Sequence, residues 1–281
     1  MISKGLAYLG PEGTFSHEAA VAWGSARGVK VFLPAENLLQ VAQAVLEGRC
    51  DAAVLPLENS IEGSVNLTQD LLMEEPSLKI VGEVILDIHH CLVTKEKSLE
   101  GITEVWSHPH ALAQCRRFLA KYLPKARLCP TSSTAGAFLV AASRKGSSAV
   151  GSSFAAKLYG LPVLCRDIED YPENKTRFII VSRENIPGQG PYKTSLVLAL
   201  HENRPGGLYN VLRDFAEAGI NLTRIESRPT KKELGEYLFF LDCEGHAENE
   251  PLAGVLASLR PRTSLLRVLG SYPAHREGEV R

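Results

Sequence analysis

The sequence places a hydroxyl, a guanidinium and an aromatic ring side by side in Thr176-Arg177-Phe178. The β-branched run after Phe178 predicts a buried strand, so these side chains lie where a loop enters a strand. An Arg guanidinium can bind a carboxylate through two hydrogen bonds. We therefore expect a site for a small anionic ligand that contains a ring. From spacing alone, an ordinary strand entry with a capping Thr and a surface Arg is at least as good an interpretation.

Two motifs make the sequence resemble the prephenate dehydratase family. Asp170, five intervening residues and Thr176-Arg177-Phe178 before an apolar strand are similar to one family signature. Residues 222–229, Leu-Thr-Arg-Ile-Glu-Ser-Arg-Pro, are similar to a second. The motifs occur in the family's order, and the resemblance runs from Tyr8 to about Gly270. It implies conversion of prephenate to phenylpyruvate in L-phenylalanine biosynthesis, with feedback inhibition by phenylalanine.

The resemblance also implies roles for individual residues. Thr176 matches the family's catalytic threonine, and Asn59 and Gln114 fall on family active-site positions. Because a threonine hydroxyl is too basic to act as a general acid near neutral pH, we expect Thr176 to stabilise the charge on the departing oxygen. The implied substrate-binding residues are Arg177, Phe178, Ser60, Glu58, Thr14 and Ser132. A core position is an equally good interpretation of Phe178.

Residues 108–110 depart from the family pattern. The sequence has His-Pro-His where the family often has His-Pro-Gln. An imidazole at position 110 can titrate near neutral pH, so the pH profile of activity could differ from that of the family. His108 is an alternative proton donor, although a structural histidine at a strand end is the preferred interpretation.

Residues 205–208 match the helix entry of the family's ACT domain, a phenylalanine sensor that usually has Pro-Gly-Ala-Leu here. The implied effector-binding residues are Asn203, Pro205, Gly206, Gly207, Leu208, Asn221, Leu222, Glu226 and Ser227. A helix cap followed by a strand end is the plain alternative. Because effector sites in this family form between the ACT domains of two subunits, the resemblance implies a homodimer or homotetramer.

The composition is that of an ordinary globular protein. A length of 281 residues predicts two domains, and a content of 44% hydrophobic and 22% charged residues is typical. A net charge of -1 gives no basic footprint for nucleic acid or a membrane surface. No apolar run reaches the roughly 18 residues of a membrane span, and no secretory signal is recognisable. The six cysteines are therefore expected to be reduced thiols in the cytoplasm.

Strands and helices alternate through the first two thirds of the chain, which predicts an α/β fold with a parallel-type sheet. The predicted strands are 6–9, 29–33, 52–57, 79–94, 105–107, 149–151 and 162–166. The predicted helices start near His17, Leu38, Val65, Thr131 and Ser152, and one more turns Leu112, Cys115, Phe118, Leu119 and Tyr122 inward.

A segment rich in Gly and Pro at 185–191 predicts a linker. The predicted elements after it have the order βαββαβ, the ferredoxin-like arrangement, which resembles an ACT domain at residues 194–272. For residues 1–184 the resemblance implies a catalytic domain with a fold like that of periplasmic binding proteins. Its two lobes would be about 1–77 with 171–184, and about 78–170, with Thr176 on the hinge side of the cleft. No fused chorismate mutase is expected, because the sequence starts almost directly at the catalytic part.

Neither a cofactor nor a metal is predicted. Residues 89–91 and 108–110 lack a standard ligand set such as paired Cys-x-x-Cys, and no Gly-x-Ser-x-Gly motif supplies a serine nucleophile. Two alternatives to prephenate dehydratase remain. One is arogenate dehydratase, which performs the same chemistry on the aminated substrate. The other is a ligand sensor without turnover, which would usually bring an output module such as a helix-turn-helix.

Overall fold

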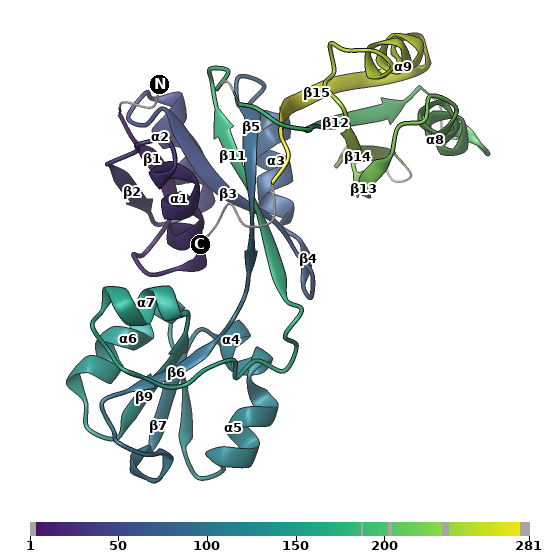
Figure 1. Cartoon of the computed structure of the whole chain (residues 1–281). Helices are drawn as coiled ribbons and strands as arrows, with labels where there is room; N and C mark the ends of the chain where they lie inside the picture. The colour runs from purple at the N-terminus through teal and green to yellow at the C-terminus, as the bar shows by residue number, and fades with distance from the viewer. Residues whose placement is uncertain (1–3, 187, 202–203, 232–235, 276–281) are drawn as a thin grey trace. The chain divides into compact units, whose positions relative to one another are not determined.

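The computed structural model describes residues 4–186, 188–201, 204–231 and 236–275 (Figure 1). The chain forms two compact units. The first comprises the residues up to Leu71 together with Val84–Ile179, and the second comprises Leu72–Glu83 together with the segment that begins at Ile180. The boundary runs through the strands β5 (Lys79–Asp87) and β11 (Lys175–Ser182).

The first sheet consists largely of strands that are buried along most of their length. Its order is β2 (Phe32–Ala35), β1 (Leu6–Leu9), β3 (Ala52–Asn59), β11 and β5, and the short β4 (Gly63–Ser64) pairs with β3. Strand β1 is parallel to β2 and β3. The helices that follow these strands are α1 (Phe15–Ser25), α2 (Leu38–Leu46) and α3 (Asn66–Glu74). The predicted strand at 29–33 begins later, at Phe32, because the Val29 N–H still bonds the Gly24 carbonyl at the end of α1.

The second sheet is mixed, so the predicted parallel-type sheet is wrong for this part. Its order is β10 (Val163–Cys165), β6 (Cys91–Thr94), β9 (Ser147–Gly151), β7 (Glu104–Ser107) and β8 (Arg127–Pro130). Strand β7 is parallel to β8 and β9, but β6 is antiparallel to β9 and β10 is antiparallel to β6. Strands β6 and β10 carry the chain into and out of this sheet. Parallel neighbours need a helical crossover between them, and β6 is not joined to β9 or to β10 by one. These strands can therefore pair in the antiparallel direction.

The helices of the second sheet differ from the prediction at one point. They are α4 (Pro109–Gln114), α5 (Arg116–Tyr122), α6 (Thr134–Ser143) and α7 (Ser153–Leu158), with a 3-10 turn, η1 (Leu99–Gly101). The helix predicted through Leu112 and Tyr122 is broken at Cys115, whose backbone is at φ -112° and ψ 15°. The Asp170 carboxylate accepts the Arg117 N–H at 3.0 Å and caps the new helix start. Tyr122 is consequently 47% exposed, and its predicted inward position is wrong.

The two sheets form two lobes, which confirms the predicted two-lobed α/β fold. The chain leaves the first sheet after Asp87, rather than near residue 78 as predicted, and β6 begins at Cys91. It returns between Cys165 and Lys175. Thr176 therefore lies where the chain re-enters the first sheet.

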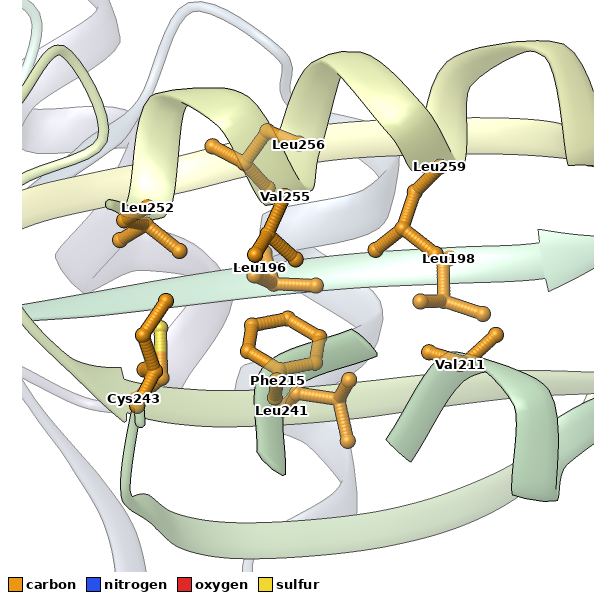
Figure 2. Close-up of a cluster of buried hydrophobic side chains, with 11 residues drawn as sticks. Leu196, Leu198, Val211, Phe215, Leu241, Cys243, Leu252, Val255, Leu256 and Leu259 are labelled. Carbon is orange, nitrogen blue, oxygen red and sulfur yellow. The ribbon is translucent and has the colours of Figure 1, made fainter. Parts of the chain in front are cut away.

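The third sheet confirms the predicted βαββαβ order. Its strands are β13 (Leu222–Pro229), β14 (Tyr237–Glu244), β12 (Tyr192–Leu200) and β15 (Thr263–Pro273), in that spatial order and antiparallel throughout. The helices are α8 (Gly207–Glu217), α9 (Leu252–Leu259) and the 3-10 turn η2 (Arg260–Arg262). Figure 2 shows the core between these helices and the sheet, with Phe215 of α8 pointing toward Leu241 of β14.

Within the second unit, buried polar contacts join the segment Leu72–Glu83 to the third sheet. The Lys193 ammonium donates to both carboxylate oxygens of Glu83, at 2.8 and 3.0 Å. The Arg267 guanidinium donates to the carbonyl oxygens of Leu72 and Met73, at the C-terminal end of α3. These carbonyls have no partner within the helix, so Arg267 supplies the hydrogen bonds that a helix end requires.

Phe215→Ala is expected to destabilise the second unit by about 3–5 kcal/mol, because it removes a fully buried ring from the core of Figure 2. The matched control is Tyr209→Ala on the same helix, where the side chain is 65% exposed and the expected change is within about 0.5 kcal/mol. Urea unfolding followed by circular dichroism measures both. Equal losses would contradict this assignment of the core.

Candidate active site

The first unit contains a cavity of about 320 Å³ whose walls come from both lobes. It is bounded by the start of α1, the turn after β3, helix α4 and the start of α6. Five of the predicted site residues line it: Thr14, Asn59, Gln114, Ser132 and Thr176. The cavity thus brings together residues that lie far apart in the sequence, including the three that were predicted to be catalytic.

Asn59 holds Thr176 in a fixed hydrogen-bond arrangement. Its Nδ2 donates to Thr176 Oγ1 and to Asn174 Oδ1, both at 2.8 Å. Its Oδ1 accepts the backbone N–H groups of Ile61 and Glu62, at 2.9 and 3.0 Å. Because the amide oxygen has two backbone donors, the orientation of the amide is determined by its surroundings. The Thr176 hydroxyl accepts from Asn59, so its own proton is available to a ligand in the cavity.

Gln114 joins the second lobe to the same network. Its Oε1 lies 3.0 Å from His90 Nε2 and 3.3 Å from Asn174 Nδ2, and its Nε2 donates to Glu62 Oε1 at 3.0 Å. Burial lowers the pKa of His90, which favours the neutral ring. Because the neighbouring Gln114 Oε1 can only accept a hydrogen bond, the ring proton is assigned to Nε2. Among the residues that the structure describes, His90 Nδ1 has no hydrogen-bond partner.

Two helix N-termini supply positive electrostatic potential to the cavity. Helix α1 begins after Thr14, whose hydroxyl accepts from the His17 N–H at 3.2 Å and donates to the Leu9 carbonyl at 2.9 Å. Helix α6 begins after Ser133, whose hydroxyl accepts from the Gly136 N–H at 3.0 Å. In the described part of the chain, the N–H groups of the first two residues of each helix make no hydrogen bond. Such groups bind anions.

The remaining charge of the cavity wall is limited. No lysine or arginine is among the described residues that line it, and Glu62 is the one carboxylate. The imidazoles are His90, His108 and His110. The exposed Ser132 hydroxyl makes no hydrogen bond within the described residues, so it can bind a ligand.

Four predicted substrate-binding residues lie outside the residues that line the cavity. Arg177 is 6% exposed, and its Nη1 lies 3.4 Å from Glu58 Oε1. Phe178 is buried in the sheet, and Ser60 Oγ accepts the Lys175 N–H at 2.9 Å. Because successive strand residues point to opposite faces, Thr176 faces the cavity and Arg177 faces away from it. The substrate-binding roles of these four residues stay predictions.

Sequence reasoning did not identify Glu62 and His90 as site residues. Each lies just beyond a strand of the first sheet, which is the usual position of ligand-binding residues in α/β sheets. That position was the available signal. Their hydrogen bonds to Gln114 join residues that are 24 and 52 positions apart, so neither could be inferred from local sequence.

The predicted effector residues of the second unit fall into two groups. Pro205, Gly206, Gly207 and Leu208 form the start of α8, where Gly206 has the positive φ of 80° that favours glycine. Gly207 lines a cavity of about 270 Å³ with residues of β12, α8 and η2.

The second group belongs to the start of β13 and the residue before it. Leu222 packs against the core of Figure 2, Asn221 Nδ2 donates to Glu244 Oε1 at 3.1 Å, and Glu226 pairs with Arg224. Ser227 follows in the same strand. None of these residues lines the cavity at Gly207. Asn203 lies outside the described residues.

One group of side chains has ligand atoms close enough to hold a metal ion. The atoms of His89, Asp167 and Glu169 lie within 4.8 Å of one another. His89 Nδ1 is 2.7 Å from Glu169 Oε1, a hydrogen bond that raises the pKa of His89. A protonated His89 explains the cluster without an ion. The absence of a metal and of a cofactor stays a prediction.

The fold and the cavity define a two-lobed α/β domain with a cleft at which two helices begin, followed by a ferredoxin-like domain. The prephenate dehydratase family matches residues 6–186, and the ACT domain family matches residues 194–261. The chain belongs to the prephenate dehydratase family, whose chemistry is that of a carbon–oxygen lyase, and it carries an ACT domain. The family prediction is confirmed.

Similar proteins cover nearly the whole chain. A prephenate dehydratase of Methanocaldococcus jannaschii is 41% identical over 97% of this chain and 99% of its own length. The crystal structure of a prephenate dehydratase of Arthrobacter aurescens in complex with L-Phe is 38% identical, with a TM-score of 0.85 over 95% of this chain and 89% of that chain. GqqA, described as a novel type of quorum quenching acylase, is 36% identical, with a TM-score of 0.84 over 96% of this chain and 98% of that chain.

Among the described residues, no helix has both the length and the apolar character that a membrane crossing requires.

Glu18→Gln is expected to stabilise the protein at alkaline pH and to have little effect in acid. Burial raises the pKa of Glu18 from 4.5 to about 7, and one of its carboxylate oxygens has no partner among the described residues. The folded state therefore keeps a proton that the unfolded state releases, so the wild-type protein loses stability as pH rises from about 4.5 to above 7. At pH 8 the variant should melt about 2–4 °C higher than the wild type, and at pH 4 it should melt at the same temperature. The control is exposed Glu36→Gln; a Glu18→Gln shift that is equal at both pH values would contradict the interpretation.

Proposed function

We propose that the protein converts prephenate to phenylpyruvate with loss of carbon dioxide and water, and that L-phenylalanine inhibits it. Membership of the prephenate dehydratase family supports the reaction. The observation that carries the proposal for this chain is the Asn59–Thr176 hydrogen bond, at 2.8 Å, in the wall of an anion-binding cavity.

The charge of the substrate fits the cavity. Prephenate has two carboxylates, and two helix N-termini, those of α1 and α6, present free N–H groups there. A cavity of about 320 Å³ is large enough for a single small ring with its side chain. The helix ends can bind carboxylates through backbone N–H groups. The described cavity wall therefore needs no lysine, whose amine could react with the keto acid.

The reaction needs help mainly at the leaving oxygen. The bond between the ring carbon and its carboxyl group breaks, its electron pair enters the ring, and the ring hydroxyl leaves with its own bonding pair. Aromatisation drives both steps. The Thr176 proton can bond the departing oxygen, and Asn59 strengthens that bond by donating to Thr176 Oγ1. The hydroxyl leaves as water after it takes up one proton.

Two other activities compete with this proposal. Arogenate dehydratase chemistry would use the same cavity for a substrate with an added ammonium group. The similarity to GqqA suggests an acylase, which would need an activated nucleophile. Within the described residues, no histidine hydrogen-bonds the hydroxyl of Thr176, Ser132 or Ser133, so no side chain there is paired with a base. Lyase chemistry is therefore better supported than acylase chemistry.

Thr176→Ala should lower kcat by about 10²–10³-fold and leave KM nearly unchanged, because the lost hydrogen bond forms mainly in the transition state. Thr176→Ser keeps a hydroxyl in reach of Asn59 and should retain most of the activity. Steady-state formation of phenylpyruvate measures both variants. Equal changes in kcat and KM would assign Thr176 to substrate binding instead.

The regulatory part of the proposal concerns the second unit. Of the predicted effector residues within the described chain, Gly207 alone lines the cavity at the start of α8, which supports an effector site completed by the ACT domain of a second subunit. We therefore infer a homo-oligomer, dimer or tetramer. The six cysteines are free thiols, which supports a cytoplasmic location.

L-Phenylalanine should suppress turnover of prephenate, with a coupling free energy of about 1–3 kcal/mol. Ultraviolet detection of phenylpyruvate, with and without phenylalanine, measures turnover and coupling together, and arogenate and an N-acyl amide serve as alternative substrates. Turnover of arogenate or the amide alone would overturn the substrate assignment. Turnover of prephenate that phenylalanine does not change would overturn the regulatory part only.

A further inference from the structure

His110 forms a short side-chain contact in the cavity wall. Its Nδ1 lies 2.6 Å from Glu62 Oε2, and the other Glu62 oxygen accepts from Gln114 Nε2 at 3.0 Å. Glu62 lies in the turn after β3 in the first lobe, and His110 lies in α4 of the second. Both line the cavity that contains Thr176. Position 110 is also where this sequence departs from the family pattern.

A carboxylate in this wall is unfavourable for an anionic substrate. Glu62 is the one acidic residue among the described residues that line the cavity, and no lysine or arginine there balances it. Prephenate brings two further negative charges, and like charges repel at short range. The side chain of Glu62 is held toward the cavity by its hydrogen bond to Gln114 Nε2, at 3.0 Å. A group that neutralises its charge in this position would favour the anionic substrate.

His110 is the imidazole that can do this. The His108 Nδ1 accepts the His110 backbone N–H at 3.3 Å, so that nitrogen carries no proton, and burial lowers the pKa of His108. His90 is buried and neutral, and it bonds Gln114. The side chain of His110 is 62% exposed and its Nδ1 lies against the Glu62 carboxylate, so it is the imidazole placed to pair with that charge. The titratable groups that face it are Glu62, from the turn after β3, and His108, whose ring centre lies 5.0 Å away.

We propose that His110 determines substrate affinity and preference by neutralising Glu62 at the cavity wall. With His110 protonated, the pair has no net charge and the cavity accepts the prephenate dianion. With His110 neutral, the uncompensated carboxylate repels prephenate and favours a substrate that carries an ammonium group, such as arogenate. This inference rests on the proposed function, and it makes His110 a positioning and specificity residue rather than the proton donor.

The effect of the charge on KM separates this role from a structural one. His110→Gln keeps a hydrogen bond to Glu62 without the charge. The variant should therefore have a KM for prephenate about 5- to 10-fold above that of the wild type, because an uncompensated carboxylate repels the dianion. Its kcat should stay within about 3-fold of the wild-type value.

Removal of the carboxylate provides the matched test. In the double variant His110→Gln with Glu62→Gln there is no charge to neutralise, so KM at pH 6 should return toward the wild-type value. The ratio of kcat/KM for prephenate to that for arogenate should fall in His110→Gln and recover in the double variant. His246→Gln, which removes an imidazole from the second unit, controls for loss of a histidine as such and should match the wild type.

The possible results separate a failure of the proposed function from a failure of the inference about His110. Absence of prephenate turnover in the wild type would overturn the proposed function itself. Wild-type turnover with an unchanged KM and substrate ratio in His110→Gln would overturn only the inference about His110. A fall in kcat with an unchanged KM would also overturn it, and would assign His110 to proton donation. A raised KM that the Glu62→Gln change does not restore would assign His110 to structure rather than charge.

Discussion

The hydrogen bond from Asn59 to Thr176 is the constraint on which the active site depends. It joins the end of β3 to the start of β11, strands that are neighbours in the sheet although the two residues are 117 positions apart. The whole second lobe is inserted between them. Two backbone N–H groups of the turn after Asn59 fix the amide, so the position of the Thr176 hydroxyl follows from the strand order and one turn.

The electrostatics of the cavity follow from the same architecture. Helix α1 of the first lobe and helix α6 of the second lobe both begin at the cavity, so two helix N-termini meet there. Their backbone N–H groups can bind anions and carry no titratable charge, whereas the buried guanidinium of Arg177 lies against the partly exposed carboxylate of Glu58. The ionisable side chains that line the cavity are Glu62 and the three imidazoles.

The sequence predicted the fold class well because its signals are local. Alternating strands and helices and the βαββαβ order each depend on residues close in the chain. One family motif placed Thr176 among the site residues, and the wider resemblance added Asn59 and Gln114. The errors involve tertiary contacts. The break at Cys115 depends on Asp170, which lies 53 residues from Arg117, and the partner of Arg177 is 119 residues away. Thr176 and Arg177 were also assigned to one site, although successive residues of a strand point to opposite faces of the sheet.

The most direct test of this account is a crystal structure with a prephenate analogue whose saturated ring cannot aromatise. The account predicts that the ring hydroxyl lies within about 3 Å of Thr176 Oγ1 and that the Asn59 amide still donates to that oxygen. It also predicts that the two carboxylates lie at the N-termini of α1 and α6. A carboxylate bound to Arg177, or a ring hydroxyl directed away from Thr176, would contradict it.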